Sequence, residues 1–287
     1  MTDTPGLTLI CGAPRSGTTW IHNSLIECGL FCGVPALADE YKRRNNGDLF
    51  TDEHPETMRI SIKVSNTENF LLHRLHLVKL RRILRRTAQA YSNHDRFFIE
   101  SPYYCFSINA FFEIFGGKLR VVFIKRNPIS VAVSMSQHVH ISKLLRKNNV
   151  LDSFELHQSK LYQKEYIESK YSNQDVLTFV KRYYHQFSLI ERALFKWHYF
   201  NRAFCITSCD IQKKNMLIVD YDNIAETQTS SSMQNEICNF FNFSASTRIS
   251  FLRTYKYSRN RFDRSILSDK GKDLLDLVLQ TTFLGDP

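Results

Sequence analysis

The sequence contains no long hydrophobic run and no paired cysteine motif. None of its apolar segments approaches the roughly 20 residues that a membrane-spanning helix needs. Its seven cysteines include no Cys-x-x-Cys pair, and no histidine spacing suggests a zinc site. Residues 1–6 are polar and the first apolar run, 7–10, is short, unlike a signal peptide. These absences predict reduced thiols, a cytoplasmic location, no transmembrane segment and no bound metal.

The composition is that of a globular protein with a basic surface. Of the 287 residues, 43% are hydrophobic and 23% are charged, which is enough to bury a core. The 38 Lys and Arg against 28 Asp and Glu give a formal net charge of +10, which attracts polyanions without choosing among them. Neither an internal repeat nor a low-complexity linker interrupts the chain, so we predict one domain over 1–287.

Short apolar runs alternate with helical segments along the chain. The predicted strands cover 7–11, 97–99, 119–124 and 216–219, and helices are predicted near 17–28, 109–115, 233–241 and 272–278. These strands are apolar without alternation, which indicates a parallel sheet covered by helices on both faces. The fold class is therefore α/β. Two further stretches, 70–86 with many arginines and 176–204 with many aromatics, predict amphipathic helices packed on the core.

The segment Gly12-Ala13-Pro14-Arg15-Ser16-Gly17-Thr18-Thr19-Trp20 follows a strand and begins a helix. At such a position backbone N–H groups and the helix dipole favour an anion. Ser16, Thr18 and Thr19 add hydroxyl donors and Arg15 adds a positive charge. We expect this loop to bind phosphate.

Two alternatives compete for this loop. The Walker A loop of kinases and ATPases has the same glycine spacing, but Thr18 stands where that loop carries its lysine. A plain turn between a strand and a helix does not explain the order Pro-Arg-Ser-Gly-Thr-Thr-Trp.

This loop resembles that of the PAPS-dependent sulfotransferase family, where PAPS is 3′-phosphoadenosine-5′-phosphosulfate. The resemblance implies that residues 14–20 bind the 5′-phosphosulfate and that Arg15 contacts the leaving phosphate. It also implies that Trp20 stacks on adenine. The implied fold is a single P-loop-like domain, and the implied product is adenosine 3′,5′-bisphosphate.

A second segment matches the same family. The predicted strand 119–124 leads into Lys125-Arg126-Asn127-Pro128, and Ser134 follows Arg126 by eight residues. In the family, an arginine and a serine in these places bind the 3′-phosphate, and a guanidinium suits two phosphate oxygens. Alone, Asn127-Pro128 is typical of a helix start.

Weaker matches follow towards the C-terminus. Tyr221 resembles a family tyrosine that approaches adenine, although a strand-end tyrosine without a ligand explains it equally well. Arg259 and Arg261 fall where many members place a basic loop over the 3′-phosphate, but the Gly-x-x-Gly-x-Trp-Lys form of the cytosolic enzymes is missing.

The proton acceptor departs from the cytosolic enzymes. Their Lys-Thr-His is Glu100-Ser101-Pro102 here, which is closer to the Lys-Ser/Thr-Pro of carbohydrate and bacterial members. Glu100 is our candidate for the general base, with an ion pair to Arg15 or Arg126 as its other interpretation. The reserve candidates are His138, His140, Asp39, Glu40 and Asp52.

The acceptor is left open by the sequence. Residues 29–50 resemble a bacterial subset of the family too loosely to name one, so we expect a small-molecule or carbohydrate hydroxyl or amine. A P-loop kinase or NTPase is one alternative function. A nucleic-acid or membrane-surface binding protein that uses the basic helix 70–86 is another, but that helix lacks aromatics suited to base stacking.

Overall fold

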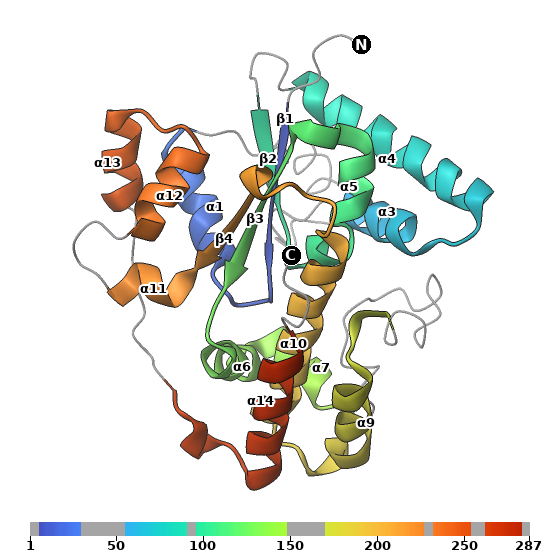
Figure 1. Cartoon of the computed structure of the whole chain (residues 1–287), viewed down its shortest axis with the longest axis vertical. Coiled ribbons are helices and arrows are strands. Elements are labelled where there is room, and N and C mark those ends of the chain that lie inside the picture. The colour runs from blue at the N-terminus through green and yellow to red at the C-terminus, as the bar shows by residue number, and fades with distance from the viewer. Residues whose placement is uncertain are drawn as a thin grey trace. The chain divides into compact units, whose positions relative to one another are not determined.

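The computed structural model describes residues 6–29, 55–90, 96–147, 170–226, 232–253 and 262–282 (Figure 1). The chain divides into two compact units. Unit 1 comprises residues 1–12, 17–124 and 210–257, and unit 2 comprises residues 13–16, 125–209 and 258–287. The single domain over 1–287 stays a prediction.

A four-stranded sheet forms the centre of unit 1, in the order β2-β1-β3-β4. The strands are β1 (Gly6–Gly12), β2 (Arg96–Glu100), β3 (Leu119–Lys125) and β4 (Met216–Asp220). β1 is buried along its whole length and pairs in parallel with both β2 and β3. Its burial on both faces explains why its sequence is apolar without alternation. The carboxyl ends of these three strands share one edge, where open α/β sheets bind ligands.

Helices cover both faces of this sheet. In Figure 1, α1, α12 and α13 lie on one side of it and α3, α4 and α5 on the other. The α-helices of unit 1 are α1 (Thr18–Glu27), α3 (Pro55–Asn66), α4 (Phe70–Ala90), α5 (Ile108–Phe115), α11 (Tyr221–Glu226), α12 (Ser232–Phe240) and α13 (Ala245–Arg253). Short 3-10 turns cover Pro102–Phe106, Gly116–Lys118 and Lys213–Asn215.

The described part of unit 2 is helical. Its helices are α6 (Pro128–Gln137), α7 (Val139–Leu145), α9 (Gln174–Tyr183), α10 (Leu189–Thr207) and α14 (Asp269–Thr282), with 3-10 turns at Tyr184–Gln186 and Arg264–Ile266. α10 packs against α6 and α14. It is buried on nearly every side, including Trp197, Tyr199 and Phe200, so it forms the core of the unit.

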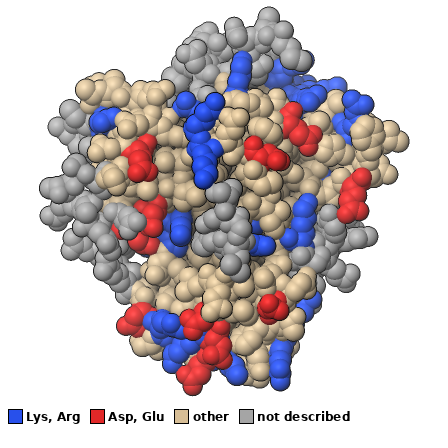
Figure 2. Space-filling view, in the orientation of Figure 1, with Lys and Arg blue, Asp and Glu red and all other residues tan. Residues whose placement is uncertain are grey.

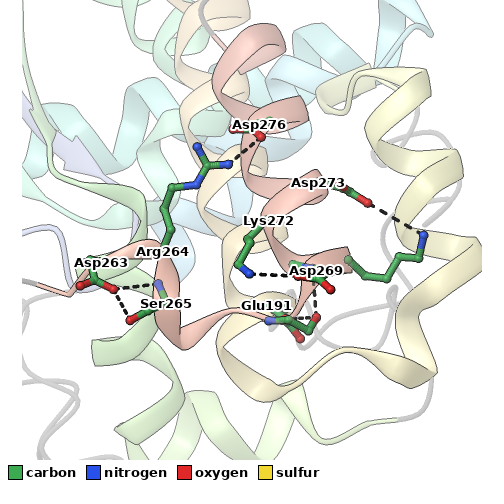
Figure 3. Close-up of polar contacts among 11 residues, drawn as sticks. Glu191, Asp263, Arg264, Ser265, Asp269, Lys272, Asp273 and Asp276 are labelled. Carbon is green, nitrogen blue, oxygen red and sulfur yellow. Dashed lines mark hydrogen bonds and ion pairs between the residues drawn. The ribbon is translucent and has the colours of Figure 1, made fainter.

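A buried carboxylate joins the beginnings of α10 and α14 (Figure 3). The Oε2 of Glu191 accepts from the Ser188 N–H at 2.7 Å, while its Oε1 accepts from the Ser268 N–H at 2.8 Å and the Ser268 hydroxyl at 2.5 Å. Burial raises the pKa of the Glu191 carboxyl, but these hydrogen bonds outweigh burial and leave the pKa below its ordinary value. Gly271 leaves the room that this carboxylate needs, because a Cβ there would meet Oε1.

Exposed ion pairs surround this contact. Arg264 pairs with Asp276 at 2.6 Å, and Lys272 pairs with Asp269 at 3.0 Å (Figure 3). In the lower part of Figure 2, where Figure 1 draws α14, acidic and basic side chains lie next to one another. Exposed pairs of this kind contribute about 0–1 kcal/mol each, so the buried Glu191 matters more to this end of the unit.

The predicted α/β fold is confirmed, and the four predicted strands lie where expected. The interpretation of 176–204 as one helical stretch was wrong, because the 3-10 turn at Tyr184–Gln186 and the residues Phe187 and Ser188 separate α9 from α10. Ser188 and Glu191 form a capping box, a hydrogen-bonded arrangement that begins a new helix at Leu189. The cysteines that the structure describes are free thiols, and no described helix is long and apolar enough to cross a membrane.

Candidate functional site

The loop after β1 begins with a tight turn. The Ser16 N–H donates to the Ala13 carbonyl at 3.0 Å, with Pro14 and Arg15 as the two central residues. Pro14 supplies the fixed φ that suits the first central position. Arg15 has a φ of 69°, in the left-handed region that glycine normally occupies. This conformation costs a non-glycine residue about 1 kcal/mol or more, which is a feature of functional loops.

Unsatisfied donors follow this turn. The side chain of Ser16 is 1% exposed, and its hydroxyl has no hydrogen-bond partner among the described residues. The next helix, α1, begins after Gly17 without a side-chain cap. Its first N–H groups therefore carry the partial positive charge of an open helix N-terminus. A buried hydroxyl without a partner is one kind of donor that an anion accepts from, and an uncapped helix start is another.

Gly17 makes an aromatic contact that no other residue type allows. Its φ is 115°, and a Cβ at this position would lie 2.7 Å from two ring atoms of Tyr221. The Tyr221 ring also lies 5.7 Å from the Trp20 ring in an edge-on arrangement, and Phe251 lies 5.9 Å from Trp20. Unit 1 therefore places Trp20 and Tyr221 together, with Tyr221 packed on the loop glycine.

Within unit 2, Arg15 of the first predicted phosphate-binding segment contacts the second segment. The Arg15 Nε donates to the Ser134 hydroxyl oxygen at 3.1 Å, and an Arg126 Nη1 donates to the Arg15 carbonyl at 3.2 Å. Arg126 follows β3 directly. Asn127 and Pro128 begin α6 as predicted, because the Asn127 side chain accepts from the N–H groups of Ile129 and Ser130. The cap fixes the helix on which Ser134 lies, about two turns further on.

We call Arg15, Arg126 and Ser134 the basic cluster. The guanidinium of Arg15 is exposed, and in the described part of the chain only its Nε makes a hydrogen bond. Its two Nη groups are therefore available to an anion, and Arg126 adds a second, half-buried guanidinium. Paired guanidiniums with an adjacent hydroxyl match the oxygens of phosphate.

One residue of this region was missed by the sequence analysis. The Trp197 indole N–H on α10 donates to the Arg126 carbonyl at 3.2 Å, and Trp197 is fully buried. It therefore positions the backbone of Arg126. Its place among many aromatics on a core helix gave no sign of this role.

Glu100 lies at the carboxyl end of β2 and is buried, with 7% of its surface exposed. The two residues after it are explained by local structure, since the Ser101 hydroxyl caps the turn that begins at Pro102. The Oε2 of the Glu100 carboxylate lies 4.0 Å from Nδ1 of His22 on α1, and His22 is also buried. His22 was not singled out from the sequence, although a histidine among the apolar residues of the inner helix face was a usable signal.

The other predicted residues fall in three places. Thr18 is buried and Thr19 is exposed at the start of α1. His138 and His140 belong to unit 2, where their rings lie 5.9 Å apart at the junction of α6 and α7. Outside the described residues lie Asp39, Glu40, Asp52, Arg259 and Arg261.

The comparison with family models decides the identity. The model described as "Sulfotransferase family" matches residues 8–176, which is more than half of the chain and includes the predicted phosphate loop, Glu100 and the basic cluster. This chain belongs to the sulfotransferase family.

Solved structures with a sulfotransferase title also match. The sulfotransferase domain from the curacin biosynthetic pathway is 14% identical, with a TM-score of 0.47 and coverage of 99% of this sulfotransferase and 93% of that chain. The domain from the Synechococcus PCC 7002 olefin synthase is 13% identical, with a TM-score of 0.43 and coverage of 96% of both chains. The sulfotransferase STF9 from Mycobacterium avium is 14% identical, with a TM-score of 0.45 and coverage of 98% of this sulfotransferase and 74% of that chain. Among curated proteins, none matches this sulfotransferase.

Proposed function

We propose that this sulfotransferase uses PAPS as its donor and transfers the sulfuryl group to a hydroxyl or amine of a small-molecule or carbohydrate acceptor. The observation that carries the proposal is the basic cluster, where Arg15 is hydrogen-bonded to Ser134 and Arg126 to Arg15. A donor with phosphates at both the 5′ and 3′ positions of its ribose requires such paired cationic groups. A nucleotide that carries phosphate at only one of these positions does not require the second cationic group.

The residues of the loop fit this donor. The buried Ser16 hydroxyl has a hydrogen bond to give, since the described residues offer it no partner. The exposed Nη groups of Arg15 supply charge-assisted donors, and the start of α1 supplies backbone N–H groups. We assign the 5′-phosphosulfate to Arg15–Thr19 and the 3′-phosphate to Arg126 and Ser134. Trp20, Tyr221 and Arg259 stay predicted donor contacts.

When bound, PAPS supplies the sulfuryl group and the adenosine 3′,5′-bisphosphate that leaves. Arg15 stabilises the negative charge that grows on the departing phosphate oxygen, because a preorganised cation needs no rearrangement at that moment. Arg126 and Ser134 hold the 3′-phosphate and so fix the position of the donor. We expect the reaction to need no metal.

Glu100 is the proton acceptor in this proposal. In-line displacement at sulfur requires a base for the proton of the attacking hydroxyl or amine. Glu100 is a buried carboxylate at the sheet edge where ligands bind in open α/β folds. We assign His22 the role of positioning Glu100, because its Nδ1 lies 4.0 Å from the carboxylate.

The test is transfer of radiolabelled sulfuryl from PAPS to a panel of phenols, sugars, alcohols and amines. We expect a labelled product with at least one acceptor class and an equal amount of adenosine 3′,5′-bisphosphate. An Arg15→Ala variant should be inactive although folded. Turnover of ATP without turnover of PAPS would contradict the proposal and favour a P-loop kinase.

A further inference from the structure

The helix α4 exposes apolar and basic side chains that the proposed reaction does not use. Its exposed large apolar residues are Phe70 (67%), Leu71 (71%), Leu72 (48%), Leu75 (65%) and Val78 (56%). Its basic residues are Arg74, Lys79, Arg81, Arg82, Arg85 and Arg86, and the helix contains no acidic residue. Contiguous exposed apolar side chains on this scale are uncommon on a soluble monomer and mark an interaction surface.

The two kinds of side chain are arranged along one face of the helix. At 100° per residue, Leu71, Leu75, Val78, Arg82 and Arg85 share a face, because their spacing is four, three, four and three. The apolar members occupy the N-terminal half of this face and the arginines its C-terminal half. Leu80 and Leu84 on the opposite face are buried, and α4 packs against α3. The exposed face is therefore not needed for the core.

In Figure 1, α4 lies on the outer side of the helices that cover one face of the sheet. In Figure 1, α3 and α4 form a hairpin whose turn points away from the sheet, and Phe70–Leu72 follow that turn. Lys and Arg side chains gather in the upper right of Figure 2, where Figure 1 places the C-terminal part of α4.

Acidic neighbours neutralise only part of the charge. Lys79 pairs with the Glu56 carboxylate at 2.8 Å, whereas Arg81 donates to the backbone carbonyl of Glu113, which carries no charge. Arg82, Arg85 and Arg86 make no ion pair with any described residue.

We propose that this face of α4 binds the surface of an anionic lipid membrane. Its leucine and valine side chains insert at the boundary between head groups and acyl chains, while the arginines next to them contact anionic head groups. A nucleic acid would satisfy the arginines but not the aliphatic side chains, since it offers them no apolar surface. The inference does not depend on the proposed donor or acceptor.

Flotation with vesicles of phosphatidylcholine alone, and with about one third phosphatidylglycerol, tests this inference. We expect at least ten-fold tighter binding to the anionic vesicles and a loss of that binding at high salt. The double variants Leu71→Gln/Leu75→Gln and Arg82→Gln/Arg85→Gln should each lose at least ten-fold. Circular dichroism and the melting temperature should stay unchanged, because all four side chains are exposed.

Matched controls lie on other exposed elements. Val139→Gln on α7 removes an equally exposed apolar side chain (64%), and Lys213→Gln/Lys214→Gln removes two exposed charges. Both should bind vesicles like the unaltered protein.

A Leu75→Trp variant tests insertion of the face directly. Its tryptophan fluorescence should be quenched by spin-labelled lipid.

Three results would overturn the inference. The first is equal binding to neutral and anionic vesicles, and the second is an equal loss in the controls. The third is that the protein does not float with vesicles and instead uses α4 to form a dimer or to bind nucleic acid.

Discussion

The Arg15 Nε donates a hydrogen bond of 3.1 Å to the Ser134 hydroxyl, 119 positions later in the chain. Arg126 donates to the carbonyl of the same Arg15. The loop after β1 and the segment after β3 are therefore joined by two hydrogen bonds. Because Arg15 and Ser134 are so far apart in the sequence, their contact is made by the fold and not by local structure.

Arg15→Gly separates the charge of this residue from its backbone conformation. Glycine adopts the φ of 69° without strain, so we expect the free energy of unfolding to change by less than about 1 kcal/mol. The affinity for adenosine 3′,5′-bisphosphate should fall about ten-fold or more, because a charge-assisted phosphate contact is lost. Arg15→Ala should lose the same affinity and be the less stable of the two. Calorimetric titration and urea unfolding measure both quantities, and an unaltered affinity in Arg15→Gly would remove Arg15 from the site.

Gly17→Ala introduces both a strained φ and a collision with the Tyr221 ring. Gly29→Ala is its matched control, since Gly29 has a φ of 79° but nothing within 4 Å of its new Cβ. The control should lose about 1–2 kcal/mol of stability from strain alone. Gly17→Ala should lose clearly more in urea unfolding, together with nucleotide affinity. Equal losses would mean that the Tyr221 contact is unimportant.

Glu100→Gln keeps the shape of the side chain and removes the proton acceptor. With an acceptor found in the panel, the single-turnover rate at saturating donor should fall by about 10²–10⁴ while nucleotide affinity stays unchanged. Glu113→Gln is the control, because Glu113 also contacts a histidine, His73 at 3.1 Å, but is partly exposed. His22→Gln should reduce the rate less than Glu100→Gln. A near-normal rate in Glu100→Gln would transfer the role to His138, His140 or the acidic residues Asp39, Glu40 and Asp52.

Glu191→Gln tests the buried carboxylate of unit 2. An amide cannot accept all three hydrogen bonds, so we expect a loss of about 1–3 kcal/mol at pH 7. The pKa of Glu191 is lowered in the folded protein, so its contribution is complete above the unfolded pKa and is lost as the pH falls through the folded one. The difference between variant and unaltered protein should therefore shrink below about pH 4. Asp273→Asn, which removes an exposed pair with Lys270, should cost less than about 0.5 kcal/mol at either pH in urea unfolding.

Local patterns predicted much of the fold because each carries its own physical cause. The apolar segment at β3 and the pair Asn127-Pro128 each specify an element without help from the rest of the chain. The break between α9 and α10 also has a local cause, because Ser188-x-x-Glu191 is the sequence of a capping box. The run of aromatic residues led us to predict one continuous helical stretch instead. Aromatic content predicts burial, not continuity of a helix.

The candidate site was predictable only in part. The residue types and order of the loop predicted phosphate binding, but the left-handed Arg15 and the collision that Gly17 avoids arise from tertiary structure. His22 lies 4.0 Å from Glu100, and Trp197 donates to the Arg126 carbonyl, each across separate elements. No spacing in the sequence indicates such contacts.

Discrimination between adenosine 3′,5′-bisphosphate and AMP tests the central claim most directly. The two nucleotides differ only in the 3′-phosphate, which we assign to Arg126 and Ser134. Titration calorimetry should give at least ten-fold tighter binding of the bisphosphate. Arg126→Ala should remove that preference, whereas Arg146→Ala, which removes an exposed arginine of the same unit, should retain it. Equal affinities for the two nucleotides in the unaltered protein would contradict PAPS as the donor.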